Sequence, residues 1–146
     1  AEAEARQALA GCARANGVAE RVTVGGFCDI PELIDALGDG TDVLLVCDIE
    51  GGEAVLLDPD RVPALGRVTI LVECHGLAEE FTERLLVARF LPTHEVQQIA
   101  TETRVLAHLP PGVAEPWRSR LPATTEALMQ EHRHQQQSWL VLSPRP

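Results

Sequence analysis

Apolar positions along the chain fall into two short, dense runs separated by longer stretches with helical spacing. The first run, 43–47, is unbroken, and the second, 68–72, contains a single threonine. A polar residue comes directly after each run. Short apolar runs of this kind are typical of strands that are buried on both faces, as in a parallel sheet. The pattern therefore predicts buried strands at 42–47 and 67–74.

Apolar residues three and four positions apart predict a helix at the start of the chain. Between Ala3 and Ala15, the side chains of Ala5, Leu9 and Cys12 fall on one arc. Asn16-Gly17 then supplies a left-handed stop.

Two further helices have clear signals. Asp29 to Glu32 has the form of a capping box with an early proline, which predicts a helix from there to Leu37 that ends at Gly38. A helix is also predicted at 77–90. Its expected core residues are Leu77, Phe81 and Leu85, and its expected outward residues are Arg84 and Arg89.

Weaker patterns complete the expected order of elements. Pro122 is expected to exclude an early start of the last helix, and a proline-rich loop is expected at 110–116. The remaining predicted elements are strands at 21–25, 94–101 and 138–142, and helical segments at 53–57, 58–66 and 126–133.

Helices and strands alternate along most of the chain, which predicts an α/β sheet with helices on both faces. The length of 146 residues suits a single domain, 1–146. The last two strands have no clean helical crossover between them, so the pattern also allows an antiparallel strand at the end of the chain.

Composition narrows the classes of partner and compartment. The formal net charge is −10 and every basic residue is an arginine, which argues against nucleic acid and against an anionic membrane as partners. The four cysteines have no CxxC spacing, so we expect reduced, buried thiols in a cytoplasmic protein. No signal peptide and no apolar run of about 20 residues is present in the sequence.

Polar residues follow each of the two buried strands. Asp48 and Glu50 follow the first, and Glu73 and His75 follow the second. Ligands of open α/β sheets bind beyond the carboxyl ends of the strands, so these four residues form the candidate site if the strands are neighbours. Carboxylates and an imidazole suit a hydroxylated or cationic ligand, or a divalent metal.

The alternative for these residues is structural. One or two of them would cap the helices that follow, and Glu53 would do no more than that. D-x-E and E-x-H are weak metal signals, because residues at i and i+2 share a side only while the strand continues. No metal site is therefore assigned.

Four stretches of the chain resemble a known family. They are ARANGVAERVTV (13–24), DVLLVCDIEGGEAVLLDP (42–59), VTILVECHG (68–76) and SWLVL (138–142). Together they resemble the later part of a class I S-adenosylmethionine-dependent methyltransferase. The D-I-E-G-x-E core resembles the branch called FkbM-like. The resemblance implies a Rossmann-like sheet, mostly parallel, with an antiparallel C-terminal strand.

The resemblance also implies roles for particular residues. Asp48 would lie near the transferred methyl group and the acceptor, with Glu50 beside it, and Glu73 or His75 would accept a proton. The segment of Phe27, Cys28 and Asp29 would flank the adenine of S-adenosylmethionine, which Asp48 would also approach.

The chain departs from the family pattern at its start. The glycine-rich loop and the acid that binds the ribose hydroxyls are absent from this sequence, which implies a partial domain that lacks the first two strands. We expect either that a second copy of the chain or an N-terminal segment before Ala1 covers the exposed sheet edges, or that the sheet is rearranged.

The expected function is methyl transfer from S-adenosylmethionine to oxygen or nitrogen of a small-molecule acceptor. The alternative is a catalytically inactive, methyltransferase-like module for interaction or dimerisation. A weaker third alternative is a metal-dependent site at Asp48, Glu50, Glu73 and His75.

Overall fold

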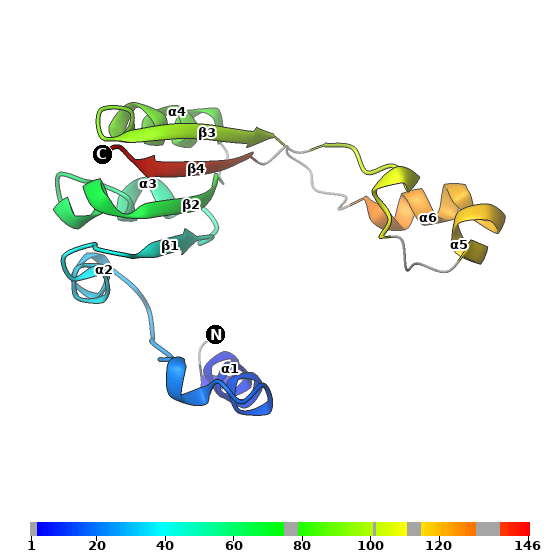
Figure 1. Cartoon of the computed structure of the whole chain (residues 1–146), viewed down its shortest axis with the longest axis horizontal. Coiled ribbons are helices and arrows are strands. Elements are labelled where there is room, and N and C mark those ends of the chain that lie inside the picture. Colours follow the sequence, from blue (N-terminus) through cyan, green and yellow to red (C-terminus); the bar gives the residue numbers. More distant parts are fainter. Residues whose placement is uncertain (1–2, 75–78, 101, 111–114, 131–137) are drawn as a thin grey trace.

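The computed structural model describes residues 3–74, 79–100, 102–110, 115–130 and 138–146. Its centre is a four-stranded sheet in the order β1-β2-β4-β3 (Figure 1). The strands are β1 (Leu44–Cys47), β2 (Thr69–Cys74), β3 (His94–Ala100) and β4 (Ser138–Pro144).

Three strands of this sheet share one direction. β1 pairs in parallel with β2, and β4 pairs antiparallel with both β2 and β3. It follows that β1, β2 and β3 run the same way and β4 alone is reversed. The chain is therefore an α/β protein with a mixed sheet, and the predicted reversal of the last strand is confirmed.

Helices connect the strands, and the local sequence sets where several of them begin and end. Asp29 caps α2, since its Oδ1 accepts a hydrogen bond from the Glu32 amide at 3.4 Å, and Gly38 ends the helix at φ 57°. The helical segments are α1 (Ala3–Ala15), η1 (Ala19–Arg21), α2 (Ile30–Leu37), α3 (Glu53–Leu56), η2 (Pro63–Arg67), α4 (Glu79–Phe90), η3 (Leu106–His108), α5 (Glu115–Arg120) and α6 (Pro122–Met129).

The hydrophobic core lies on one face of the sheet. Alternate residues of the strands enter it, because successive side chains of a strand point to opposite faces. Helices α2 and α4 cover this face with Leu33, Leu37, Leu86 and Phe90. The sheet residues in the core are Cys47, Ile70, Val72, Cys74, Leu140 and Leu142.

The opposite face of the sheet is largely open, which corrects two expectations. Leu44 and Val46 of β1 are 63% and 57% exposed, so this strand is buried on one face only. The helices that enter the core pack on the other face, and the expected cover on both faces is wrong. β1 is an edge strand, and the described residues form no second helical layer over its exposed face.

The expected strand at 21–25 is also absent. Arg21 ends η1, and the residues from Val22 to Asp29 form no regular element. β-Branched residues favour a strand only where a neighbouring strand offers hydrogen bonds. This segment pairs with none of the described strands.

The orientation of α4 differs from the sequence pattern. Phe81 is 65% exposed, whereas Leu86 and Phe90 are fully buried. Arg89 does not point outward: its guanidinium donates to the carbonyls of Ala54 and Leu57 at the end of α3. These contacts satisfy carbonyls that the helix leaves unpaired, and they rotate α4 away from the face predicted from Phe81. Leu77 lies outside the described residues.

The strands on either side of segment 101–137, β3 and β4, are neighbours in the sheet. Ala100 and Ser138 are directly opposite each other in the β3–β4 register. Within this segment α6 begins at Pro122, where the prediction excluded a helix, because the missing amide costs nothing in a first turn. Among the described residues, no helix has the length and apolarity that a bilayer span requires.

Candidate functional site

The two predicted groups of acids lie at the same end of the sheet, where β1 and β2 end. In the parallel register Cys47 pairs with Val72, and Asp48 and Glu73 are the residues that follow this last pair at the same end of the sheet. Asp48 and Glu50 are exposed, whereas Glu73 is only 5% exposed. The condition set by the sequence, that the two strands are neighbours, is therefore met. His75 lies outside the described residues.

The loop that follows β1 is held by a residue expected to be only a helix cap. Glu53 is fully buried, and its Oε1 accepts hydrogen bonds from the amides of Ile49 at 3.4 Å and Gly51 at 3.2 Å. A carboxylate that accepts two backbone hydrogen bonds fixes the loop against the first turn of α3. Glu53 is therefore the organising residue of the loop.

This loop has a backbone conformation that side chains rarely adopt. Glu50 has φ 56° and Gly51 has φ 108°. For a residue with a side chain, the left-handed region costs roughly 1–2 kcal/mol. The hydrogen bonds to Glu53 compensate for that cost, and the exposed side chain of Glu50 is held next to Asp48 at the end of β1.

Two buried thiols lie behind this edge. Burial, followed by the negative charges of Glu53 and Asp48, raises the pKa of Cys47 to about 12. Burial also raises the pKa of Cys74, to about 11, despite an opposing hydrogen bond with Ser138. Cys47 and Cys74 lie on adjacent strands, and both are free thiols. The prediction of buried thiols holds for this pair, whereas Cys12 and Cys28 are exposed.

The four thiols are expected to divide into two pairs in a reactivity assay. With a chromogenic disulfide reagent at pH 8, Cys12 and Cys28 should react at once, and Cys47 and Cys74 only after unfolding, because they are buried and remain protonated. As pH rises from 9 towards 11, the unfolded chain loses thiol protons that the folded chain keeps, so the free energy of unfolding should fall. Rapid reaction of all four thiols in the native protein would contradict this assignment.

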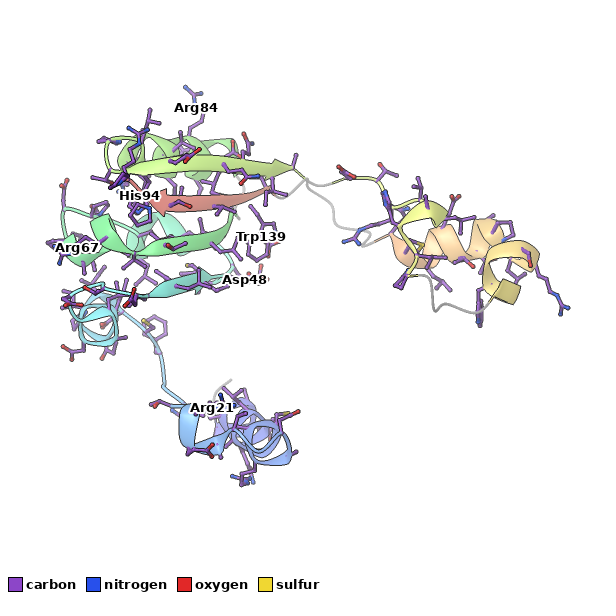
Figure 2. All side chains as sticks on the ribbon, viewed as in Figure 1. Arg21, Asp48, Arg67, Arg84, His94 and Trp139 are labelled. Carbon is purple, nitrogen blue, oxygen red and sulfur yellow. The ribbon has the colours of Figure 1, made fainter. Side chains whose placement is uncertain are left out.

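The reversed last strand brings a tryptophan to the same edge. Trp139 is half-buried and pairs across the strands with Glu73, and Figure 2 shows it at the same end of the sheet as Asp48. Trp139 is not among the site residues predicted from the sequence. The predicted reversal of the last strand was a signal that could have placed it there, since an antiparallel strand starts where the parallel strands end.

The residues expected to flank adenine lie in the segment before α2. Phe27 is 84% exposed and Cys28 is exposed. Asp29 uses its carboxylate to cap α2.

The described residues contain no group of three or more His, Cys, Asp or Glu side chains placed to hold a metal ion. This finding concerns the described part of the site, since the four-residue metal alternative includes His75.

Comparisons with known proteins do not extend this description. No protein-family model, no curated protein and no solved structure matches the chain significantly.

Proposed function

We propose that the chain is part of an S-adenosylmethionine-dependent methyltransferase domain that transfers a methyl group to oxygen or nitrogen of a small molecule. The observation that carries the proposal is the loop 48–53. Glu53 holds this loop from within, and Asp48 and Glu50 stand exposed at the carboxyl end of β1. The D-I-E-G-x-E resemblance assigns the acceptor side of a methyl-transfer site to the same residues.

The sheet offers further support. Its three strands of one direction and its reversed last strand agree with the antiparallel C-terminal strand that the resemblance implies. Because β4 is reversed, Trp139 lies at the end of the sheet where Asp48 and Glu73 lie. A ligand there would contact an aromatic side chain as well as carboxylates.

The residues present fit two sides of the cofactor. Phe27 is exposed enough to lie against an adenine ring, and Asp48 is exposed at the carboxyl end of β1. Asp29 would contribute its backbone, since its carboxylate already caps α2. For the ribose and the methionine, the chain has neither the acid nor the glycine-rich loop.

The chain's own residues would orient and deprotonate the acceptor. Asp48 and Glu50 accept hydrogen bonds from hydroxyl or amine protons at the exposed edge. Glu73, buried beside Trp139, would take the proton that the acceptor loses, with His75 as the alternative base. When bound, S-adenosylmethionine supplies an electrophilic methyl group on its sulfonium.

The proposal is tested by calorimetric titration with S-adenosylhomocysteine at up to millimolar concentration. We expect a saturable heat that Asp48→Asn weakens by roughly tenfold or more, the loss expected from one strong hydrogen bond. The matched control is Asp35→Asn, an exposed aspartate of α2, which should bind like the original. No heat at millimolar ligand would exclude cofactor binding by this chain.

A second candidate function is a catalytically inactive interaction module. The open face of the sheet, with Leu44 and Val46 exposed, favours it. Light scattering separates the two candidates, because a monomer that binds the cofactor would argue against an interaction role.

A further inference from the structure

The outer edge of β1 has backbone groups that can pair with a further strand. The amide of Thr69 donates to the Val43 carbonyl at 3.2 Å, so Val43 and every second residue after it bond to β2, as a parallel ladder alternates. The backbone N–H and C=O groups of Leu44 and Val46 therefore point to the other side, where no described strand lies. Charges or proline usually protect such an edge, and β1, with the sequence LLVC, has neither.

The segment 22–25 has the properties of a strand without a neighbour. Its sequence is VTVG, and β-branched residues favour strands. Val22 has extended backbone, with φ −116° and ψ 116°. Val22 and Val24 are half-buried whereas Thr23 and Gly25 are exposed, which is the alternation of a strand with one covered face. The structure nevertheless forms no regular element here.

Helix α2, which joins this segment to β1, has an apolar arc that the sheet does not fully cover. The arc consists of Ile30, Leu33, Ile34 and Leu37, spaced three and four residues apart. Leu33 and Leu37 lie in the core and Ile30 packs against it, but Ile34 is 43% exposed. A further strand beside β1 would extend the sheet and give this arc more surface to pack on.

The topology of the chain sets the side of β1 on which such a strand must lie. Connections between parallel strands of one sheet are right-handed in nearly all proteins. The connection from β1 to β2 crosses the core face, where Leu56 of α3 packs and Leu65 of η2 is buried, and α2 packs on the same face. Two right-handed connections on one face progress across the sheet in one direction. A strand before α2 therefore belongs on the side of β1 opposite to β2, which is the free edge.

We propose that the segment 22–25 closes onto the edge of β1 as an additional, parallel strand, with Gly25-Gly26 as the hinge. The structure describes the open arrangement, in which the segment between η1 and α2 runs away from β1 (Figure 1). In the closed arrangement, the outward backbone groups of Leu44 and Val46 bond to the segment. The connection 26–43 is longer than the dozen or so residues that a crossover between parallel strands needs.

Closure also changes the surroundings of the candidate site. A strand at 22–25 that is parallel to β1 ends at the same end of the sheet, and Phe27 follows it by two residues. The exposed ring of Phe27 would then lie near Asp48. The pairing itself does not depend on methyl transfer, and it is measured on the backbone rather than by cofactor binding.

Amide hydrogen exchange followed by nuclear magnetic resonance tests the pairing. We expect the amides of Leu44 and Val46 to exchange at least roughly tenfold more slowly than unstructured amides. Val24→Pro should abolish this protection, because proline removes a backbone donor and is excluded from a paired strand, whereas Val24→Thr should keep it. Unprotected amides at Leu44 and Val46 in the original chain would overturn the proposal. Protection that survives Val24→Pro would also overturn it, since another element would then cover the edge.

A cross-link identifies the segment that pairs with β1. In a chain whose two exposed cysteines are replaced by serine, Thr23→Cys is combined with Leu44→Cys or with Val46→Cys. Mild oxidation should give an intrachain disulfide in one of the two, since opposite Cα atoms of neighbouring strands lie within about 7 Å. Thr69→Cys, one strand further on β2, should give none with Thr23→Cys. An interchain disulfide would show that a second copy supplies the strand, and no disulfide in either combination would show that the segment does not reach the edge; either result overturns the proposal.

Discussion

Replacing Phe90 with alanine is expected to lower the free energy of unfolding by about 3–5 kcal/mol, because the change removes a fully buried aromatic side chain and leaves a cavity. The ring of Phe90 packs edge-to-face on His94, with the centroids 5.1 Å apart. His94 is itself buried, and its Nε2 bonds with the Val68 carbonyl at 3.0 Å. The cavity would open where α4, β3 and the start of β2 meet, so neighbouring side chains have little freedom to fill it.

Urea denaturation followed by circular dichroism measures this effect. Phe81→Ala is the matched control, because Phe81 lies on the same helix but is 65% exposed; it should change stability by about 0.5 kcal/mol or less. Whole domains are stable by only about 5–15 kcal/mol, so Phe90→Ala could leave much of the chain unfolded. Phe90→Leu, with a smaller cavity, should then give a measurable intermediate loss. Equal effects at positions 81 and 90 would show that α4 packs by its other side.

Replacing Glu53 with alanine is expected to cost about 2–4 kcal/mol of stability. The change removes the carboxylate that accepts hydrogen bonds from the amides of Ile49 and Gly51, and a hydrogen bond to a charged group is worth about 1.5–3 kcal/mol. Glu53→Gln keeps one acceptor oxygen but loses the charge, so it should cost less. The left-handed backbone at Glu50 would lose its support in the alanine variant.

Urea denaturation and amide hydrogen exchange together check this prediction. Exchange should accelerate at Ile49 and Gly51 before it changes in β2, since the loop opens without global unfolding. Glu20→Ala, an exposed glutamate in η1, should leave both measurements unchanged. If Glu53→Ala were as stable as the original, the carboxylate would not be what fixes the loop.

The sequence was sufficient for those elements whose signals are local. α2 begins and ends as predicted because Asp29 caps it and Gly38 terminates it, and β2 is marked by its apolar run. Tertiary context decided the others. The residues from Arg21 to Gly25 have the composition of a strand, but no described strand lies beside them, and composition alone cannot supply a partner.

Which face of an element is buried also depends on tertiary context rather than on local sequence. An apolar run such as 43–47 shows that a strand prefers burial, not that a second layer exists to bury it, and Leu44 and Val46 remain exposed. In α4 the spacing of Phe81 and Leu85 was a valid helical pattern. Instead, Leu86 and Phe90 pack into the core, and Arg89 donates a hydrogen bond to the Leu57 carbonyl at the end of α3.

The candidate site was predictable where it depended on strand ends. Asp48 and Glu73 come together because their strands are parallel neighbours. The role of Glu53 was missed because it acts on backbone amides, and a sequence does not show which amides lack acceptors. Trp139 was missed because the predicted reversal of the last strand was not applied to the position of the first residues of that strand.

The facing of Ala100 and Ser138 across the β3–β4 ladder has a consequence for how such a chain can change over time. A segment that departs and returns at one rung of a ladder can lengthen, shorten or be exchanged while every strand keeps its register, because loop closure cost grows only slowly with length. The sheet end from which it departs is the end that carries Trp139. Changes of length or sequence in 101–137 can therefore alter which groups lie near that end of the sheet, while the strands themselves stay the same.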